Sequence, residues 1–437
     1  MKKRFIIGFL GFIGLMGNSF AQNGFNMPYS QFGIGISEQP YNLPMVTRMG
    51  GVVQTRSGKN YINPFNPASY GSIQKESFVF DMGAGIQMTT LSDNDKRMKD
   101  ADGNISYLMV GFPVTDWMKV AGGLMPYSAT DYESVAIGTG PGYDTVKNFY
   151  NGTGGTSQLF IGSSFNLLGN GLEGRRLQVG FNINYLTGRI ERGRSYQFLH
   201  TDTTYFMNKY YYKETKISNF LFDLGVQYWE PLGEKYTLGV GLTYKPYRKC
   251  NVNDKAVIYT ASDTIYPLSG NSPKFTSTLE QDHTIGIGVS LERNKRWLVA
   301  ADASFAGWSG LKYTEGSSNP ILGDDAFQAG PWSRYALGIE KIGSMDASSY
   351  WGRISLSLGA HLEQGAMRLY LQGKEQVVNE WGAGLGVTLP MRKGQSLLTL
   401  SVGYSRLGNK DLLQRETLTF GISVSTCERW FVKRKYN

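Results

Sequence analysis

Residues that could support catalysis are few in this 437-residue chain, which has three histidines and two cysteines. Hydrolysis by a serine nucleophile requires a histidine beside the serine and a third group that orients the histidine. Asp282 and His283 are adjacent, but neighbours on a strand point to opposite faces and cannot cooperate directly. No cysteine or histidine spacing suggests zinc. We therefore expect a protein that is not an enzyme, with no catalytic residue, metal site or cofactor.

Six charged or titratable residues stand inside stretches where apolar and small residues alternate. By parity, each falls on the polar face of its stretch: Asp81, Asp223, Asp302, Arg353, His361 and Glu363. What these side chains can do depends on the space that this polar face encloses, and therefore on the elements that carry them.

Alternation with period 2 is the strongest pattern in the sequence and is typical of β-strands. In Tyr236–Tyr244 every even position is Tyr, Leu or Val, and every odd position is Thr or Gly. The chain contains 55 glycines and 13% aromatic residues, but only 18% charged residues. This composition favours an all-β protein over a soluble α/β enzyme.

A soluble β-sandwich also alternates, but its strands are commonly about 5 to 6 residues long. Here the alternating segments reach about 10 residues or more, which is the length of a strand that crosses a bilayer. Their polar face is mainly Gly, Ser, Thr and Asn, which suits a barrel lumen. Fourteen segments can be counted: 77–91, 104–114, 118–137, 149–168, 177–198, 210–232, 236–258, 276–292, 297–311, 333–342, 351–366, 379–391, 397–408 and 412–425. We predict a transmembrane antiparallel β-barrel of 14 strands over 77–425, integral to the outer membrane.

The connections between the predicted strands alternate between short turns and longer segments. Short turns belong on the periplasmic side of such barrels and long loops outside. The longer segments, expected as external loops, are 92–103, 138–148, 199–209, 259–275, 312–332 and 367–378.

The two ends of the chain lie outside the barrel pattern. Residues 1–21 have a basic start, an apolar stretch and a small residue at Ala21, which predicts a cleaved signal peptide. Residues 22–76 show no sustained period, so they either dangle or fold into the lumen. We favour an N-terminal hatch, because a lumen of fourteen strands would otherwise leak. Residues 426–437 are expected to form a periplasmic tail.

Several short motifs occur in an order that resembles the FadL family of outer-membrane transporters for hydrophobic molecules, in its Bacteroidetes form. They are Arg48–Val52 and Asn66-Pro67-Ala68 in the hatch, Tyr244-Lys245-Pro246, Ala301-Asp302, Trp308-Ser309, and the tail from Glu428 to Lys435. The resemblance covers nearly the whole mature chain. It implies passive uptake of a fatty-acid-like ligand from outside, with lateral exit into the membrane through a kinked third strand.

The third predicted strand has features of its own that weaken it. Pro126 cannot donate to a β-ladder, and Gly122-Gly123 lies just before it. We expect an interrupted ladder here, which is either a lateral gap for a ligand or an ordinary bulge near the outer rim.

The six polar-face residues would point into the lumen, since a charge facing lipid costs about 2–4 kcal/mol at the midplane. They either anchor the hatch or contact a ligand headgroup, or they serve only as ordinary polar residues of a water-filled lumen. Asp302 is the favoured functional residue. The net charge of +9 is scattered, which gives no nucleic-acid site but is compatible with outer-membrane lipid and lipopolysaccharide.

A second function remains open from the sequence. Some FadL-like barrels act as docking or structural subunits of outer-membrane secretion or assembly complexes, and this role would need protein partners. Tyrosine-rich external segments, such as 205–212, suit either a ligand funnel or a protein-binding rim.

The two cysteines, Cys250 and Cys427, are expected near opposite ends of the barrel. Because a disulfide requires Cα atoms within about 7 Å, we predict no bond between them.

Overall fold

The computed structural model describes residues 27–37, 43–93, 96–140, 143–169, 174–199, 208–262, 265–271, 273–308, 310–316, 327–328, 330–371, 374–391, 395–408 and 413–429. The predicted signal peptide 1–21 and residues 430–437 of the predicted tail lie outside these ranges. No helix in the described ranges is long and apolar enough to cross a membrane.

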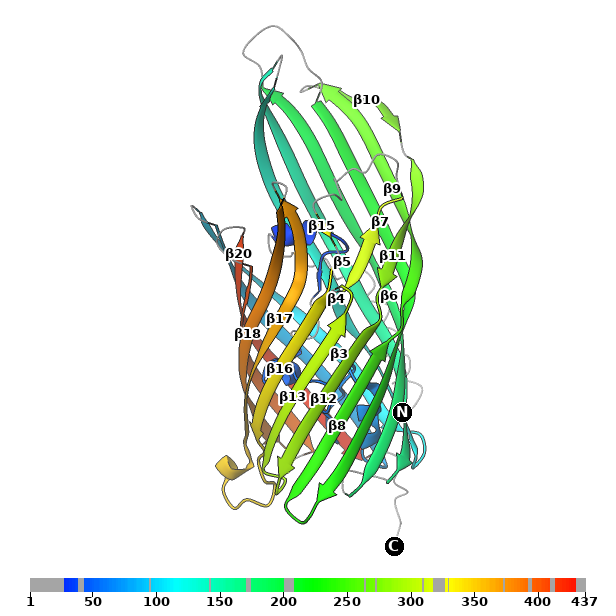
Figure 1. Ribbon diagram of the computed structural model, residues 1–437, viewed down its shortest axis with the longest axis vertical. Helices are drawn as coiled ribbons and strands as arrows, with labels where there is room; N and C mark the ends of the chain where they lie inside the picture. The colour runs from blue at the N-terminus through cyan, green and yellow to red at the C-terminus, as the bar shows by residue number, and fades with distance from the viewer. Residues whose placement is uncertain are drawn as a thin grey trace, which may run out of the picture.

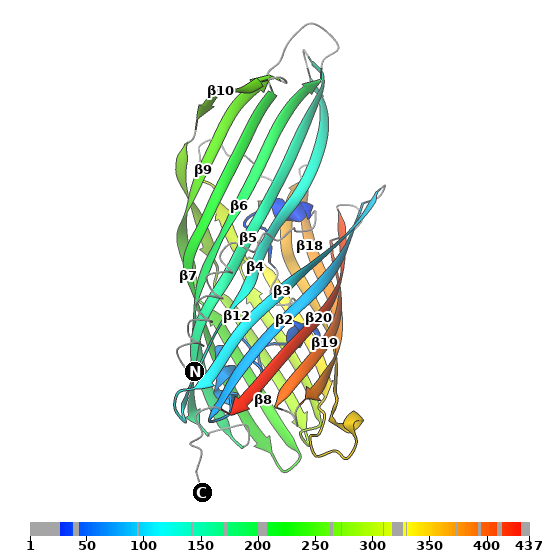
Figure 2. The same ribbon diagram turned by 180° about the vertical axis from the view of Figure 1, so that it is seen from behind.

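The structure is a closed, antiparallel β-barrel of fourteen strands, as the sequence predicted (Figures 1 and 2). The strand segments are β1 (Ile36–Ser37), β2 (Ser77–Ser92), β3 (Arg97–Pro113), β4 (Met118–Gly140), β5 (Tyr143–Leu168), β6 (Arg176–Leu199), β7 (Asn208–Leu232), β8 (Tyr236–Lys245), β9 (Arg248–Ser262), β10 (Ile265–Asn271), β11 (Lys274–Gln281), β12 (Thr284–Arg293), β13 (Trp297–Ala306), β14 (Leu311–Thr314), β15 (Phe327–Gln328), β16 (Trp332–Lys341), β17 (Ser355–Leu371), β18 (Lys374–Met391), β19 (Ser396–Leu407) and β20 (Gln414–Arg429). The short helices are η1 (Pro28–Gln31), α2 (Pro44–Thr47), η2 (Pro67–Ser72) and η4 (Tyr350–Arg353).

The barrel closes where β2 pairs with β20 along its whole length, from Ser77 opposite Arg429 to Ser92 opposite Gln414. Some wall strands consist of two segments. β8 and β9 are separated at Pro246, where a proline cannot donate to the ladder. β11 and β12 are separated at Asp282 and His283. The two segments of each pair belong to the same barrel strand, so the number of segments exceeds the number of barrel strands.

The outer face of the barrel is apolar where the alternation predicted it. In β12, Ile287 and Val289 are each 46% exposed, whereas Ser290 is 1% exposed. Aromatic rings pack in pairs on this face: Trp117 is stacked on Phe165, and Tyr185 lies against Phe220 at 5.1 Å between ring centroids. An apolar outer face with aromatic residues is a feature of membrane-spanning barrels.

One side of the barrel is much taller than the other. β4, β5, β6 and β7 have 23, 26, 24 and 25 residues, whereas β13 and β16 have 10 each. Figures 1 and 2 show the long strands, together with β9 and β10, rising well above the other strands. We call the upper part of β4–β7 and β9 the projecting wall.

The hatch lies inside the barrel at two levels, which Figure 1 shows in blue. Residues 43–73 form the lower level with α2 and η2, and nearly all of their side chains are buried. Residues 27–37 form the upper level, which we call the strap; it contains η1 and β1. β1 pairs with β4, Ile36 opposite Ala129, so two hatch residues do join the wall.

Several predicted boundaries need correction. β17 begins at Ser355, so Arg353 lies in η4 and is not a residue of the barrel strand. β20 continues to Arg429, so the predicted tail begins within a strand. Segments 92–103 and 138–148 are largely continuations of β2–β5 and not loops.

Both cysteines are buried and free, as predicted. Cys250 lies in β9 opposite Leu279, and Cys427 lies within β20 opposite Val79. We had expected Cys427 in the tail after the last strand, but it belongs to that strand, β20.

Candidate functional site

The lower level of the hatch packs against glycines on the inner face of the barrel wall. A Cβ atom at Gly180 would lie 2.5 Å from the carbonyl carbon of Pro67, and one at Gly225 would lie 2.1 Å from Asn66 Oδ1. The predicted hatch motif Asn66-Pro67-Ala68 therefore packs directly on β6 and β7. Asn66 Oδ1 accepts from the Ala68 amide at 3.2 Å, while its Nδ2 donates to the Gln54 carbonyl at 2.7 Å.

Asp302, the residue favoured from the sequence, anchors the hatch. Its carboxylate lies in β13, is 6% exposed, and accepts from the Val53 amide at 2.5 Å and the Gln54 amide at 2.8 Å. Arg334 of β16 donates to the Gly51 carbonyl nearby. These bonds satisfy backbone groups of an irregular segment that could not otherwise be buried.

A buried ion triad, which the sequence analysis missed, holds the same segment. Glu340 of β16 lies 2.6 Å from Arg48 Nη1 and 2.8 Å from Arg56 Nη1. The side chains of Arg48, Arg56 and Glu340 are 2%, 9% and 7% exposed. The signal was present in the sequence, because Glu340 follows the alternating residues Leu337 and Ile339 on the opposite face of its strand.

Asp81 and Asp223 also point inward, as their parity indicated. Asp81 accepts from Tyr107 and Ser425 at 2.8 Å each, and from the hatch amide of Ile62 at 3.3 Å. Asp223 accepts from Asn184 at 2.7 Å. Asp81 thus contacts the hatch, whereas the bond between Asn184 and Asp223 joins two neighbouring wall strands, β6 and β7.

The strap bonds to β4 at both of its ends. At its start, the Met27 amide donates to the Asp131 carbonyl at 2.6 Å, and Ser30 bonds to the Asp131 backbone; at its end, Ile36 pairs with Ala129. Between these contacts, Tyr29 donates to the carbonyl of Leu413, the residue before β20, at 2.5 Å. Burial raises the pKa of Tyr29 to about 12, so this hydroxyl remains a donor throughout the neutral range.

The ladder between β3 and β4 stops above Leu108 and Leu124. Gly122 and Gly123 still pair with both neighbours, so the break begins beyond these two predicted residues. Pro126 lies at a register shift against β5, between Pro126 and Ser128. Above this point the β2–β3 hairpin leans away from β4, as Figure 2 shows. Among the described strands, only two-residue β1 pairs with β4 on that side.

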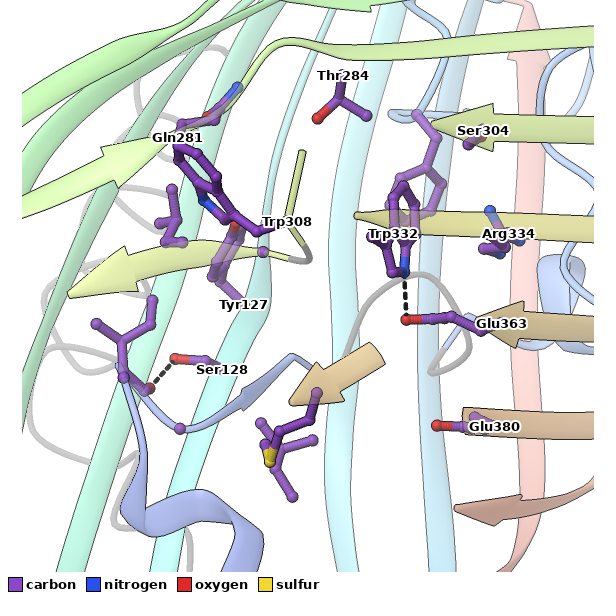
Figure 3. Close-up of a pocket in the computed structure, with 18 of the residues that line it drawn as sticks. Tyr127, Ser128, Gln281, Thr284, Ser304, Trp308, Trp332, Arg334, Glu363 and Glu380 are labelled. Atoms are coloured by element: carbon purple, nitrogen blue, oxygen red, sulfur yellow. Dashed lines mark hydrogen bonds between the residues drawn. The ribbon is translucent and has the colours of Figure 1, made fainter. Parts of the chain in front are cut away.

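A cavity of about 280 Å³ lies between the two levels of the hatch. Tyr127, Gln281 and Trp308 face it from one side, and Trp332, Glu363 and Glu380 from the other (Figure 3). Trp332 donates to Glu363 at 2.7 Å. The remaining wall positions include Gln158, Asn184, Asp223, Lys245, Arg334 and Arg415, so the lining is rich in polar groups.

Of the other two residues predicted to face the lumen, His361 lies beside the cavity, whereas Arg353 lies in a turn outside the barrel strands. His361 is 9% exposed and its Nε2 lies 3.9 Å from Glu380, next to the cavity. Arg353 donates instead to the Ala347 carbonyl at 2.9 Å within the turn that carries η4. In the described chain, no three His, Cys, Asp or Glu residues are grouped to hold a metal ion.

A further cluster occupies the inner face of the upper projecting wall. Arg194 lies over the rings of Tyr150, at 4.9 Å, and Tyr196, at 4.5 Å. Tyr150 and Tyr211 are the direct cross-strand partners of Arg194 on β5 and β7. All four side chains are half-buried. We call them the Arg194 cluster.

The full sequence, residues 1–437, matches the family model described as BamG. This chain belongs to the BamG family. A comparison with curated proteins found no match.

Solved structures show the same architecture at low identity. The Ralstonia pickettii toluene transporter TbuX is 13% identical over 88% of this chain and 97% of its own, with a TM-score of 0.56. A Pseudomonas aeruginosa FadL homologue is 12% identical over 87% and 98%, also with 0.56. The CymD monoaromatic hydrocarbon channel is 14% identical over 91% and 99%, with 0.54. The predicted FadL-type fold is therefore confirmed, and this fold implies an integral outer-membrane protein; the assignment to Bacteroidetes stays a prediction.

Proposed function

We propose that this protein is an outer-membrane docking subunit whose projecting wall binds a protein partner outside the membrane. The observation that carries the proposal is the height of the wall. At about 3.3 Å per residue and a tilt near 40°, a strand of 25 residues climbs about 60 Å, whereas the hydrocarbon core is about 30 Å thick. About half of each long strand thus stands above the membrane on one side only.

The Arg194 cluster gives this wall the chemistry of a binding surface. Tyrosine and arginine, together with tryptophan, are enriched at the residues that contribute most of the binding energy of protein interfaces. Here an arginine is held between tyrosine rings, so little side-chain freedom remains to be lost when a partner binds.

The lumen supports the same proposal. The hatch is fixed by Asp302, Asp81 and the buried triad of Glu340, and the strap spans the lumen above it. A pocket for a hydrophobic ligand is usually lined mainly by apolar side chains with few polar ones. The cavity between the hatch levels has apolar residues in its lining, but it also carries the charged side chains of Asp223, Lys245, Arg334, Glu363, Glu380 and Arg415.

Passage of hydrophobic molecules is the second candidate, and the interrupted β3–β4 ladder favours it. A ligand leaving sideways would pass near Pro126, beside the strap residues that pair with β4. TbuX and CymD are described as a toluene transporter and a hydrocarbon channel, which makes the same activity a candidate for this fold.

The two candidates separate in one experiment on membranes of the native host. We would purify tagged protein in mild detergent and compare it with Arg194→Ala/Tyr211→Ala and a control, Lys216→Ala, which changes an exposed residue on the outer face of β7. Docking predicts a stoichiometric partner that is lost only from the double variant. Transport predicts no stoichiometric partner and growth on a hydrophobic substrate that requires the protein but is unaffected by the double variant.

A further inference from the structure

The outer face of the barrel carries, at its lower end, a row of alternating aromatic and basic side chains. Arg293 of β12 lies opposite Tyr236 of β8 on one side and opposite Trp297 of β13 on the other. Trp297 in turn lies opposite Lys341 of β16. All four side chains are exposed. The row thus takes one residue from each of four adjacent strands, which Figure 1 shows side by side.

This row marks the lower boundary of the apolar outer face. On β12, the outward residues above Arg293 are Leu291 and Val289, which are 41% and 46% exposed. On β16, the outward residue above Lys341 is Ile339, which is 40% exposed. Aromatic rings and the heads of long basic side chains favour the level at which hydrocarbon meets the headgroups. We therefore place the row at a membrane–water boundary.

The boundary in question is that of the periplasmic leaflet. The turns at this end of β8, β12 and β13 are 233–235 and 294–296, and short turns belong on the periplasmic side of such barrels. The acidic neighbours Glu292 and Glu340 belong to the opposite, inner face, where Glu340 is 5% exposed. The outward face of the row is therefore positively charged at the level of lipid phosphates.

An open groove of about 660 Å³ lies on the same outer face above the row. Its floor is β13, where the outward residues Ala301 and Ala303 are small. Its walls are larger exposed side chains, which are the direct cross-strand partners of the two alanines: Val289 and Ile287 of β12, and Leu337 and Tyr335 of β16. The groove therefore offers an apolar surface that fits an extended hydrocarbon chain.

The height of the groove matches one leaflet of a bilayer. Ala303 lies six residues above Trp297, which at about 3.3 Å per residue and a tilt near 40° is about 15 Å. The hydrocarbon core is about 30 Å thick, so each leaflet contributes about 15 Å. Arg293 and Lys341 stand two strand spacings apart, about 10 Å, so their long side chains can reach the same phosphate beside Trp297.

We propose that an anionic phospholipid of the periplasmic leaflet binds along β13. Its phosphate would lie between Arg293 and Lys341, and one acyl chain would lie in the groove over Ala301 and Ala303. A zwitterionic lipid fills the groove equally well but brings no net negative charge to the two cations. The site does not depend on the docking function, because it lies at the opposite end of the barrel from the projecting wall.

Native mass spectrometry of the full-length chain in detergent measures lipid binding directly. The probes are phosphatidylglycerol and phosphatidylcholine with identical acyl chains. We expect phosphatidylglycerol to bind about tenfold tighter, and Arg293→Gln/Lys341→Gln to remove this preference. The matched control, Arg189→Gln/Lys216→Gln, removes the same two residue types from a cross-strand pair on β6 and β7 and should keep the preference. Equal binding of the two lipids to the wild-type chain, or a preference that survives in the Arg293 variant, would overturn the proposal.

A second variant tests the groove separately from the charges. Ala301→Leu/Ala303→Leu fills the groove with outward side chains, so both lipids should bind about tenfold more weakly. Its control is Ala84→Leu, which lies between the exposed residues Met82 and Ile86 on β2. The folding of each variant is checked by the heat-dependent gel mobility of folded barrels. Unchanged lipid affinity in the groove variant would contradict the proposal.

Two further measurements separate a lipid from other occupants of the same site. Inorganic phosphate at the concentration of the lipid should not displace phosphatidylglycerol, because it lacks the acyl chains; displacement would show a site for phosphate alone and overturn the lipid proposal. A photocrosslinking amino acid at Ala303, activated in native membranes, should capture phospholipid. Capture of another protein at this position instead would identify the face as a protein interface and refute lipid binding there.

Discussion

Replacing Glu340 by glutamine should release the hatch while leaving the barrel folded. The substitution keeps the shape of the side chain but removes the charge that faces Arg48 at 2.6 Å and Arg56 at 2.8 Å. Two guanidinium groups then remain buried without the carboxylate that contacts both of them. Removing one partner of a buried ion pair typically costs about 3–5 kcal/mol.

The hatch can relax toward solvent, so we take the lower end of this range. A loss of about 3 kcal/mol corresponds to an increase of about a hundredfold in the population of the open hatch. The barrel strands should be unaffected, because their ladders do not depend on the hatch.

Hydrogen exchange with mass spectrometry, on protein in detergent micelles, measures this opening directly. Amides of residues 46–53 should exchange about a hundredfold faster in Glu340→Gln, while amides of β12 and β13 keep their rates. The matched control is Glu230→Gln, which breaks an exposed pair with Arg175. Exchange of residues 46–53 that stays within about twofold of the wild-type rate would refute the anchoring role of the triad.

Three further predictions follow from single contacts. Asp302→Ala leaves the amides of Val53 and Gln54 buried without an acceptor, which costs about 1–3 kcal/mol for each amide. The hatch should therefore leave the lumen at a lower temperature than in the wild type, as measured by protease cutting within 43–56 during heating. An unchanged cutting temperature would contradict this. Gly359→Val places a Cβ 2.2 Å from the carbonyl carbon of Met49, so the hatch segment at Met49 must move away from the wall. Dye influx into cells should therefore rise. The control Gly138→Val, whose Cβ meets nothing within 4 Å, should leave dye influx unchanged. Non-reducing mass spectrometry should find two free thiols, and a Cys250–Cys427 bond would contradict the strand register.

The membrane-spanning part of the fold was predictable because lipid constrains every second residue. Tyr236–Tyr244 alternates without exception, and the structure has β8 over Tyr236–Lys245. Inward parity placed Asp81, Asp223 and Asp302 correctly for the same reason. Above the membrane this constraint ends, so segment 138–148 carries no alternation and was mistaken for a loop.

The sequence could not indicate which residues meet across the lumen. Arg48 and Glu340 are separated by 292 positions, and nothing local to either predicts the pair. Arg353 was misplaced because Ile354 and Leu356 continue the apolar parity into the turn, where Tyr350–Arg353 form a 3₁₀ helix instead. The point at which the β3–β4 ladder ends depends on how far β3 diverges, which is a property of the whole barrel.

Native mass spectrometry of complexes released from the outer membrane tests the docking claim most directly. We would compare the wild-type chain with a variant in which the hairpin residues 193–212 are replaced by a two-residue Asn-Gly turn, which keeps the paired strands below it. We expect the wild-type chain to carry a second protein and the shortened variant to appear alone, with its barrel intact. A wild-type chain that appears alone with a hydrophobic molecule retained would contradict docking. A partner that remains on the shortened variant would contradict docking on the upper part of β6 and β7, where the Arg194 cluster lies.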